Sequence, residues 1–169
     1  MRLSPPVTGT LWRELPASDR EPLIIDGHVI PRGTLVGVNI YSIHHNAEYF
    51  PDPFTFKPER WLSGEKGSTT EKLRLANSAF APFSSGARGC AGKSMAYMEA
   101  SLVVCKILFH LDVERASGAH ADMGGGWPHM GKLRGRRNEF QLYDHFASGH
   151  DGPYLKLERR GSVGKRAKE

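Results

Sequence analysis

The sequence has few cysteines and no long hydrophobic run. Only Cys90 and Cys105 occur among the 169 residues, and they form no C-x-x-C pair, which excludes a disulfide framework and a paired-thiol redox site. No stretch reaches the roughly 18 consecutive apolar residues of a membrane span, and the N-terminus has no signal-peptide core. The composition therefore indicates a globular chain from a reducing compartment, and we expect any membrane anchor to lie outside these residues.

The net charge is also small over most of the chain. The formal charge is +5, but Lys156 to Glu169 holds six Lys or Arg and two Glu, which is +4 and leaves +1 for the first 155 residues. The basic segments lack interleaved aromatic residues, which favours a solvated surface over nucleic-acid binding. Gly124 to Gly126 is not followed by the Lys-Ser/Thr pair of a phosphate loop. We therefore expect no nucleic-acid partner and a basic disordered tail over residues 161–169.

Alternating hydrophobicity and turn residues predict small antiparallel β-structure on either side of a helical segment. Asp26-Gly27 is typical of a tight hairpin. Strands are expected at 23–25, 28–30, 35–40, 140–143 and 154–158, short helices at 43–49 and 71–79, and a long helix at 91–111. Because apolar residues leave only a narrow polar stripe on the long helix, we expect it to be buried on most sides. Four aromatic residues are expected to fill the proline-rich coil after the first helix: Phe50, Phe54, Phe56 and Trp61.

The densest group of chemistry-bearing residues runs from Phe83 to Gly92 and reads Phe-Ser-Ser-Gly-Ala-Arg-Gly-Cys-Ala-Gly. Three glycines surround Cys90 and allow the backbone to turn tightly and to approach a bulky group. Arg88 adds an anion-pairing side chain, and a helical pattern begins directly after the cysteine. These features indicate a metal-thiolate loop. A structural glycine-rich turn around a buried cysteine would explain neither Arg88 nor the adjacent helix.

Five residues in this stretch match the pattern F-x-x-G-x-R-x-C-x-G: Phe83, Gly86, Arg88, Cys90 and Gly92. This pattern is the haem-binding motif of the cytochrome P450 superfamily, and the stretch resembles that loop in spacing and composition. A chance match at five fixed positions in a chain of this length is on the order of one in ten thousand or less. The resemblance continues, in the order of the family's motifs, through nearly the whole chain.

The resemblance implies a role for each motif residue. Cys90 would be the axial thiolate ligand of the haem iron, with its negative charge stabilised by backbone N–H groups at the start of the following helix. Phe83 would pack near the sulfur and exclude water. Arg88 would pair with a haem propionate, which suits its planar fork of donors. Gly86 and Gly92 complete the cofactor-binding set of the loop.

Two further arginines resemble the family's buried ion triad. Arg2 corresponds to the arginine of the E-x-x-R motif, whose glutamate would lie before Met1, and Pro58 to Trp61 resembles the P-E-R-F/W segment. By this resemblance Glu59 and Arg60 are structural, and Arg60 would face Arg2 without the shared carboxylate. Two neighbouring cations without an anion are unfavourable when buried. Without the resemblance, Glu59-Arg60 would be interpreted as an exposed charge pair.

Several assignments stay open at the level of sequence. Arg13 is either a second propionate-binding residue, as in many family members, or an ordinary surface arginine. Val7 to Leu11 is either one wall of the substrate pocket or a buried strand edge. His44-His45 favours a structural role over metal binding, because no second cluster has ligand spacing. Lys93 could help a basic surface to guide an acidic electron donor.

The resemblance implies an α+β fold in which residues 1–160 form the C-terminal portion of a cytochrome P450 domain, with haem b (iron protoporphyrin IX) as cofactor. It implies a monooxygenase that inserts one oxygen atom from O2 into a small lipophilic substrate in secondary or xenobiotic metabolism. Electrons would come from NADPH through a flavoprotein reductase. A full-length relative is expected to be a monomer on the cytosolic face of the endoplasmic reticulum membrane.

We also expect the chain to be N-terminally truncated. The family places its distal acid–threonine helix upstream, so no catalytic residue beyond the haem ligand is expected here. The isolated chain is then expected neither to retain haem stably nor to hydroxylate a substrate. The alternative is a non-catalytic haem-binding or structural remnant of a cytochrome P450 gene.

Overall fold

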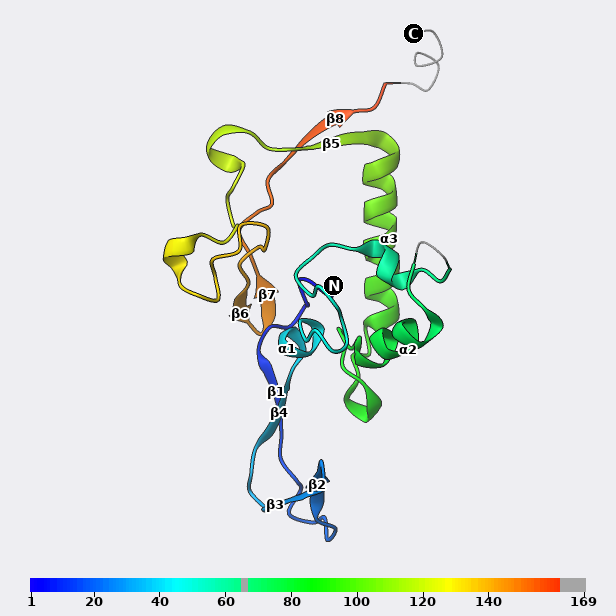
Figure 1. Ribbon diagram of the computed structural model, residues 1–169, viewed down its shortest axis with the longest axis vertical. Helices are drawn as coiled ribbons and strands as arrows, with labels where there is room; N and C mark the ends of the chain where they lie inside the picture. Colours follow the sequence, from blue (N-terminus) through cyan, green and yellow to red (C-terminus); the bar gives the residue numbers. More distant parts are fainter. Residues whose placement is uncertain (65–66, 162–169) are drawn as a thin grey trace. The chain divides into compact units, whose positions relative to one another are not determined.

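The computed structural model describes residues 1–64 and 67–161 (Figure 1). The strands are β1 (Thr10–Arg13), β2 (Leu23–Ile25), β3 (His28–Ile30), β4 (Val36–Asn39), β5 (Leu111–Arg115), β6 (Tyr143–His145), β7 (Ala147–Gly149) and β8 (Leu155–Arg159). The α-helices are α1 (Ile40–His44), α2 (Thr70–Ala79) and α3 (Lys93–His110). Single 3-10 turns are η1 (Pro58–Trp61), η2 (Gly86–Arg88), η3 (Gly118–His120) and η4 (Pro128–Met130).

The chain forms two compact units. The first comprises Met1–Pro82 and Asp144–Ser148, and the second comprises Phe83–Tyr143 and the chain from Gly149 onward. The elements are mixed helix and strand, which agrees with the α+β fold predicted from the sequence. The break between Pro82 and Phe83 falls at the start of the glycine-rich cysteine loop.

The strands pair in four two-stranded sheets. The predicted hairpin is confirmed: β2 and β3 are antiparallel, and the turn residues Asp26 and Gly27 have φ of 49° and 77°. Both values lie in the left-handed region, as the favoured two-residue hairpin turn requires. The strands on either side of this hairpin, β1 and β4, also pair antiparallel, and β5 pairs with β8 with Leu111 opposite Arg159.

The first helix begins earlier than the sequence predicted. The expected strand at 35–40 is wrong at its end, because Ile40 already belongs to α1. Asn39 causes the change: its side-chain oxygen accepts the Ser42 N–H at 2.9 Å, and its amide group donates to the Thr8 carbonyl at 3.0 Å. A short polar side chain that caps the first turn ends the strand and starts the helix at the same residue.

The core of the first unit lies around Phe50, Ala76 and Ala79, with Trp61 and Phe80 packed against them. The predicted aromatic filling is therefore confirmed for Phe50 and Trp61. For the other two aromatic residues it is wrong, because Phe56 is 79% exposed and Phe54 is exposed and stacks on His45 at 4.9 Å. Alternation in a proline-rich coil follows no fixed period, so the buried side of such a segment cannot be read from spacing.

The long helix forms as predicted, but its predicted burial is wrong. α3 has no buried residue, and Leu102, Val103 and Val104 are each more than half exposed. Apolar residues on most sides of a helix are buried only when neighbours cover every side. Among the described residues the main neighbour is β5, which continues directly from the helix. None of the described helices combines the length and hydrophobicity of a membrane-spanning segment.

The end of the chain is partly as predicted. β8 lies one residue beyond the expected strand at 154–158, and the expected strand at 140–143 is displaced to Tyr143–His145. Phe140 forms only an isolated bridge, with Gly125. The predicted disordered tail falls almost wholly on 162–169, outside the described residues.

Candidate functional site

Backbone hydrogen bonds close the cysteine loop upon itself. The Cys90 N–H donates to the Phe83 carbonyl at 2.9 Å, and the Gly89 N–H donates to the Gly86 carbonyl at 3.0 Å within η2. The Lys93 N–H then donates to the Cys90 carbonyl at 3.3 Å and begins α3. The cysteine is therefore held at a fixed place between a tight turn and a helix N-terminus.

The loop glycines differ in how strictly the backbone requires them. Gly86 has a φ angle of 69°, a value that residues other than glycine rarely adopt. A β-carbon on Gly89 would lie 3.2 Å from the Gly86 carbonyl oxygen, so the turn would have to shift. At Gly92 the nearest atom to an added β-carbon is the Cys90 sulfur at 3.8 Å, which is ordinary contact. Sequence reasoning missed Ser84, whose φ of 61° places a residue with a side chain in the left-handed region.

The Cys90 thiol is free and exposed at the start of α3. The N-cap residue of α3 is Gly92, which has no side chain to accept a capping hydrogen bond. The first N–H groups of the helix are therefore not capped by a side chain of the N-cap residue. The positive end of the helix dipole favours an anion such as a thiolate at this place. In the loop's neighbourhood, the Phe83 and Tyr97 rings lie 5.3 Å apart.

This donor set fits haem. The described residues hold no group of three or more His, Cys, Asp or Glu side chains placed to bind a metal ion. A zinc ion would need such a group, whereas haem iron takes a single protein thiolate because the macrocycle supplies four nitrogens. An exposed cysteine between a closed turn and an uncapped helix N-terminus meets that single requirement.

The two candidate propionate ligands are exposed. Arg88 ends η2, two residues before the cysteine. Arg13 ends β1 in the other compact unit, where its guanidinium donates to the Trp12 carbonyl at 2.7 Å. Neither arginine forms an ion pair within the described part of the chain, and the propionate role of each stays a prediction.

The structure brings Arg2 and Arg60 together in the first unit, each only 7% exposed. The Arg2 guanidinium donates to the carbonyls of His44 at 2.8 Å and Pro53 at 2.6 Å. It also lies 5.3 Å from the centre of the Phe50 ring, within the range of a cation–π contact. Backbone carbonyls and the face of the Phe50 ring therefore stabilise the Arg2 charge, for which sequence analysis found no partner anion.

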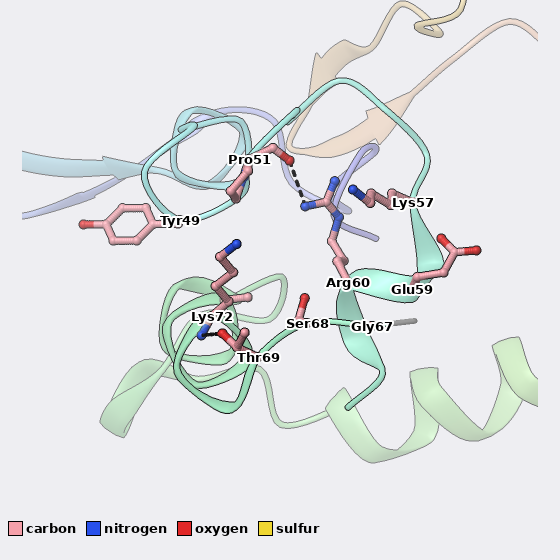
Figure 2. A pocket seen from close by; sticks show the side chains of 10 residues that line it. Tyr49, Pro51, Lys57, Glu59, Arg60, Gly67, Ser68, Thr69 and Lys72 are labelled. Carbon is pink, nitrogen blue, oxygen red and sulfur yellow. Dashed lines mark hydrogen bonds between the residues drawn. The ribbon is translucent and has the colours of Figure 1, made fainter. Parts of the chain in front are cut away.

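Arg60 is held in the same way by the coil that precedes it. Its guanidinium donates to the carbonyls of Pro51 at 3.1 Å and Asp52 at 3.3 Å, and the first of these bonds is drawn in Figure 2. Both arginines share the Thr55 carbonyl, at 3.4 Å from Arg2 and 3.5 Å from Arg60. The side chain of Glu59 is exposed and turns away from the Arg60 guanidinium in Figure 2. Its structural role stays a prediction.

The two guanidiniums destabilise each other's charge. Burial and, to a smaller extent, the nearby Arg60 charge together lower the pKa of Arg2 to about 10. Burial also lowers the pKa of Arg60, against a smaller opposite effect of Asp52. A cavity of about 280 Å³ is lined by both side chains, and among residues 1–64 and 67–161 the buried Nε of Arg60 finds no hydrogen-bond partner. The resemblance implies a carboxylate shared by these two arginines, and that role stays a prediction.

Sequence reasoning assigned His44 only a general structural role. The side chain is completely buried at the end of α1, where it stacks on Phe80 at 5.3 Å. Its Nε2 accepts the backbone N–H of Ala81 at 3.1 Å, across 37 residues of sequence. Burial lowers the pKa of His44 to about 4. The only sequence signal was a histidine pair ahead of the proline-rich coil.

Known proteins similar to this chain share one description. Residues 1–125 match the family model described as Cytochrome P450. Cytochrome P450 monooxygenase AKT7 of Alternaria alternata is 45% identical over 161 residues, which cover 94% of this chain and 30% of that protein. A cytochrome P450 monooxygenase of Gibberella zeae is 44% identical over 165 residues, covering 96% and 35% respectively. The chain thus spans about a third of the length of these relatives.

Solved structures agree in fold. The retinoic acid-bound cyanobacterial CYP120A1 aligns with a TM-score of 0.61 at 23% identity, over 94% of this chain and 30% of that one. A mutant cytochrome P450DA heme domain aligns with a TM-score of 0.64 at 18% identity, with the same coverage. At these identities the likeness concerns the fold alone.

Proposed function

Since the chain belongs to the cytochrome P450 family, we propose that it carries the haem-thiolate ligand loop of a monooxygenase that oxidises a small lipophilic substrate. The observation that supports this proposal is the closed loop that presents the Cys90 thiol at the uncapped N-terminus of α3. The relatives belong to the same family, and their alignments with this chain cover most of its length.

In this proposal Cys90 holds the haem b iron as a thiolate. The N–H groups of the first turn of α3 stabilise the negative sulfur, and the bond from Cys90 to the Phe83 carbonyl keeps the cysteine backbone in place. By the family resemblance, Phe83 would limit the access of water to the sulfur, and its ring lies 5.3 Å from that of Tyr97. A thiolate-ligated haem supplies the activation of O2, because thiolate donation favours O–O cleavage.

The arginines have two different roles. Arg88 and Arg13 are exposed and would bind the haem propionates. Arg2 and Arg60 are buried and donate to backbone carbonyls, so they would position the coil rather than touch the cofactor. This division follows from burial: a propionate ligand must be reachable, whereas a coil-positioning cation must be enclosed.

We further propose that electrons come from NADPH through a flavoprotein reductase, and that the full protein acts as a monomer in secondary or xenobiotic metabolism. The cytosolic face of the endoplasmic reticulum membrane is the proposed location. Because the chain spans about a third of its relatives, we also propose that by itself it neither retains haem stably nor turns over substrate. The exposed apolar residues of α3 support this proposal, because neighbouring segments would cover this helix in a closed cofactor site.

Titration of the purified chain with ferric haem tests the proposal. We expect the wild-type chain and Cys105→Ala to give the same thiolate-type Soret spectrum, and Cys90→Ala to lose it. Cys105 is a matched control because it is the other exposed free cysteine. Identical spectra for Cys90→Ala and the wild type would contradict the ligand assignment. A thiolate-type spectrum without turnover in a full-length relative carrying this segment would favour a non-catalytic haem-binding module.

A further inference from the structure

A second cavity of the first unit lies between the proline-rich coil and the start of α2 (Figure 2). Its volume is about 150 Å³, several times the roughly 30 Å³ that one water molecule occupies in the liquid. Three cationic side chains line it: Lys57, Arg60 and Lys72. The one carboxylate in the described lining is that of Glu59, which turns away from the Arg60 guanidinium in Figure 2. The described lining therefore has an excess of positive charge.

The charge of Arg60 is enclosed without a bound anion. Arg60 is 7% exposed, and its two terminal nitrogens donate to the carbonyls of Pro51, Asp52 and Thr55. Carbonyls are neutral acceptors, and Arg60 forms no ion pair among the residues that the structure describes. A buried cation without an anion is unfavourable. An anion in the cavity beside Arg60 would therefore stabilise this side chain.

The two lysines of the lining are exposed and available to a ligand. Neither ammonium group forms an ion pair in the part of the chain that the structure describes. In Figure 2 the amino group of Lys72 points from α2 toward the space beside Pro51 and Arg60. An ammonium is a compact charge with three rotatable donors, whereas a guanidinium has a planar fork. Since backbone carbonyls already hold the fork of Arg60, the lysines are the donors that can follow the oxygens of a tetrahedral anion.

Two hydroxyl groups at the start of α2 complete the lining. The Thr69 oxygen accepts the Lys72 N–H at 3.3 Å as the N-cap, which leaves its own O–H free to donate. Ser68 is held in place because its N–H donates to the Leu62 carbonyl at 2.8 Å. A β-carbon on Gly67 would collide with that carbonyl, so only glycine fits before Ser68. The N-terminal end of a ten-residue helix adds a preference for negative charge.

We propose that this cavity binds the phosphate group of a small soluble compound, with Lys57, Lys72 and Ser68 as donors and Arg60 as a buried fixed charge. A phosphate group carries roughly −1.5 to −2 charges near pH 7 and several acceptor oxygens, which matches a lining of three cations and two hydroxyls. A carboxylate has a single charge and suits the planar fork of an arginine, which is occupied here. The site lies wholly in the first unit and is independent of the proposed haem site.

Titration of the purified chain with inorganic phosphate, near pH 7 and at constant ionic strength, tests the proposal by amide NMR shifts. We expect saturable shifts at Ser68, Thr69 and Lys72 with a Kd on the order of 1 mM, which a ligand of five heavy atoms can reach. Lys57→Gln and Lys72→Gln should each weaken binding about five- to tenfold, as for the loss of one charge-assisted hydrogen bond at an exposed site. The matched control is Arg74→Gln, on the same helix but outside the lining, where Kd should stay within about twofold of the wild type.

The outcomes separate a phosphate site from a general attraction of anions. Equal weakening in Arg74→Gln and Lys72→Gln would overturn the proposal, because net charge alone would then matter. Acetate that binds as tightly as phosphate, or phosphate shifts that do not saturate by about 50 mM, would also overturn it.

Glycerol 3-phosphate distinguishes the two sources of the phosphate group. A monoester that binds at least as tightly as inorganic phosphate identifies a phosphorylated compound as the ligand, and a weaker one identifies inorganic phosphate; both results support the site. All three substituted side chains are exposed, so the variants should fold, and no readout requires haem.

Discussion

Acidification should destabilise the first unit through His44, and the size of the effect follows from its burial. The histidine has a pKa of about 4 in the folded chain, against an ordinary value of 6.5. Below pH 6.5 the unfolded chain takes up a proton at His44, and the folded chain does not until about pH 4. The unfolded state binds more protons in this window, so stability falls as pH falls.

The magnitude comes from the two pKa values. Each pKa unit corresponds to 1.36 kcal/mol, so the full contribution of His44 is about 3 kcal/mol, present above pH 6.5 and lost on approaching pH 4. About 2 kcal/mol of it should be lost between pH 7 and pH 5.

Urea unfolding at pH 7, 6 and 5 measures this term when the wild type is compared with His44→Gln. Glutamine does not titrate, and all other groups are shared, so the difference between the two pH profiles isolates the histidine. We expect the wild type to lose about 2 kcal/mol more than the variant between pH 7 and pH 5. Parallel profiles would refute the reasoning, since they would mean that His44 has the same pKa in the folded and unfolded chain.

Two further comparisons have expected results. Arg60→Lys should lower the free energy of unfolding by about 2–4 kcal/mol in urea titration, because an ammonium cannot reach the carbonyls that the planar guanidinium contacts. The exposed neighbour change Glu59→Gln should alter it by less than about 0.5 kcal/mol, and an equal loss in both would contradict the buried role of Arg60. Gly86→Ala should lower the free energy of unfolding by about 1–2 kcal/mol in thermal unfolding, because Gly86 has a φ angle of 69°. Gly92→Ala should unfold like the wild type, because position 92 has room for a β-carbon. The reverse order of stability would contradict the loop geometry.

The sequence predicted those parts of the fold that local chemistry determines. Asp26-Gly27 specifies its hairpin turn by itself, and the helical pattern after Cys90 specifies α3 to within two residues at its start. The end of β4 was missed because Asn39 acts as a cap through two hydrogen bonds, one of them to Thr8, a residue distant in sequence. Capping of that kind depends on the fold around it.

The candidate site was predictable where a motif fixes spacing, and less so where burial decides. Cys90 and Arg88 were found because their positions relative to the glycines carry the chemistry. The acceptor role of His44 was not found, because it requires Ala81 to come within hydrogen-bond distance from 37 residues away. The compensation of Arg2 by backbone carbonyls was also missed, since any residue type can supply a carbonyl.

The central claim is that Cys90 is the thiolate ligand of haem, and the ferrous–CO spectrum tests it most directly. Haem-loaded chain, reduced and exposed to CO without removal of excess protein, should show the red-shifted band of a thiolate haem in the wild type and in Cys105→Ala. Cys90→Ala should show only the unshifted band. A shifted band that survives Cys90→Ala would contradict the account.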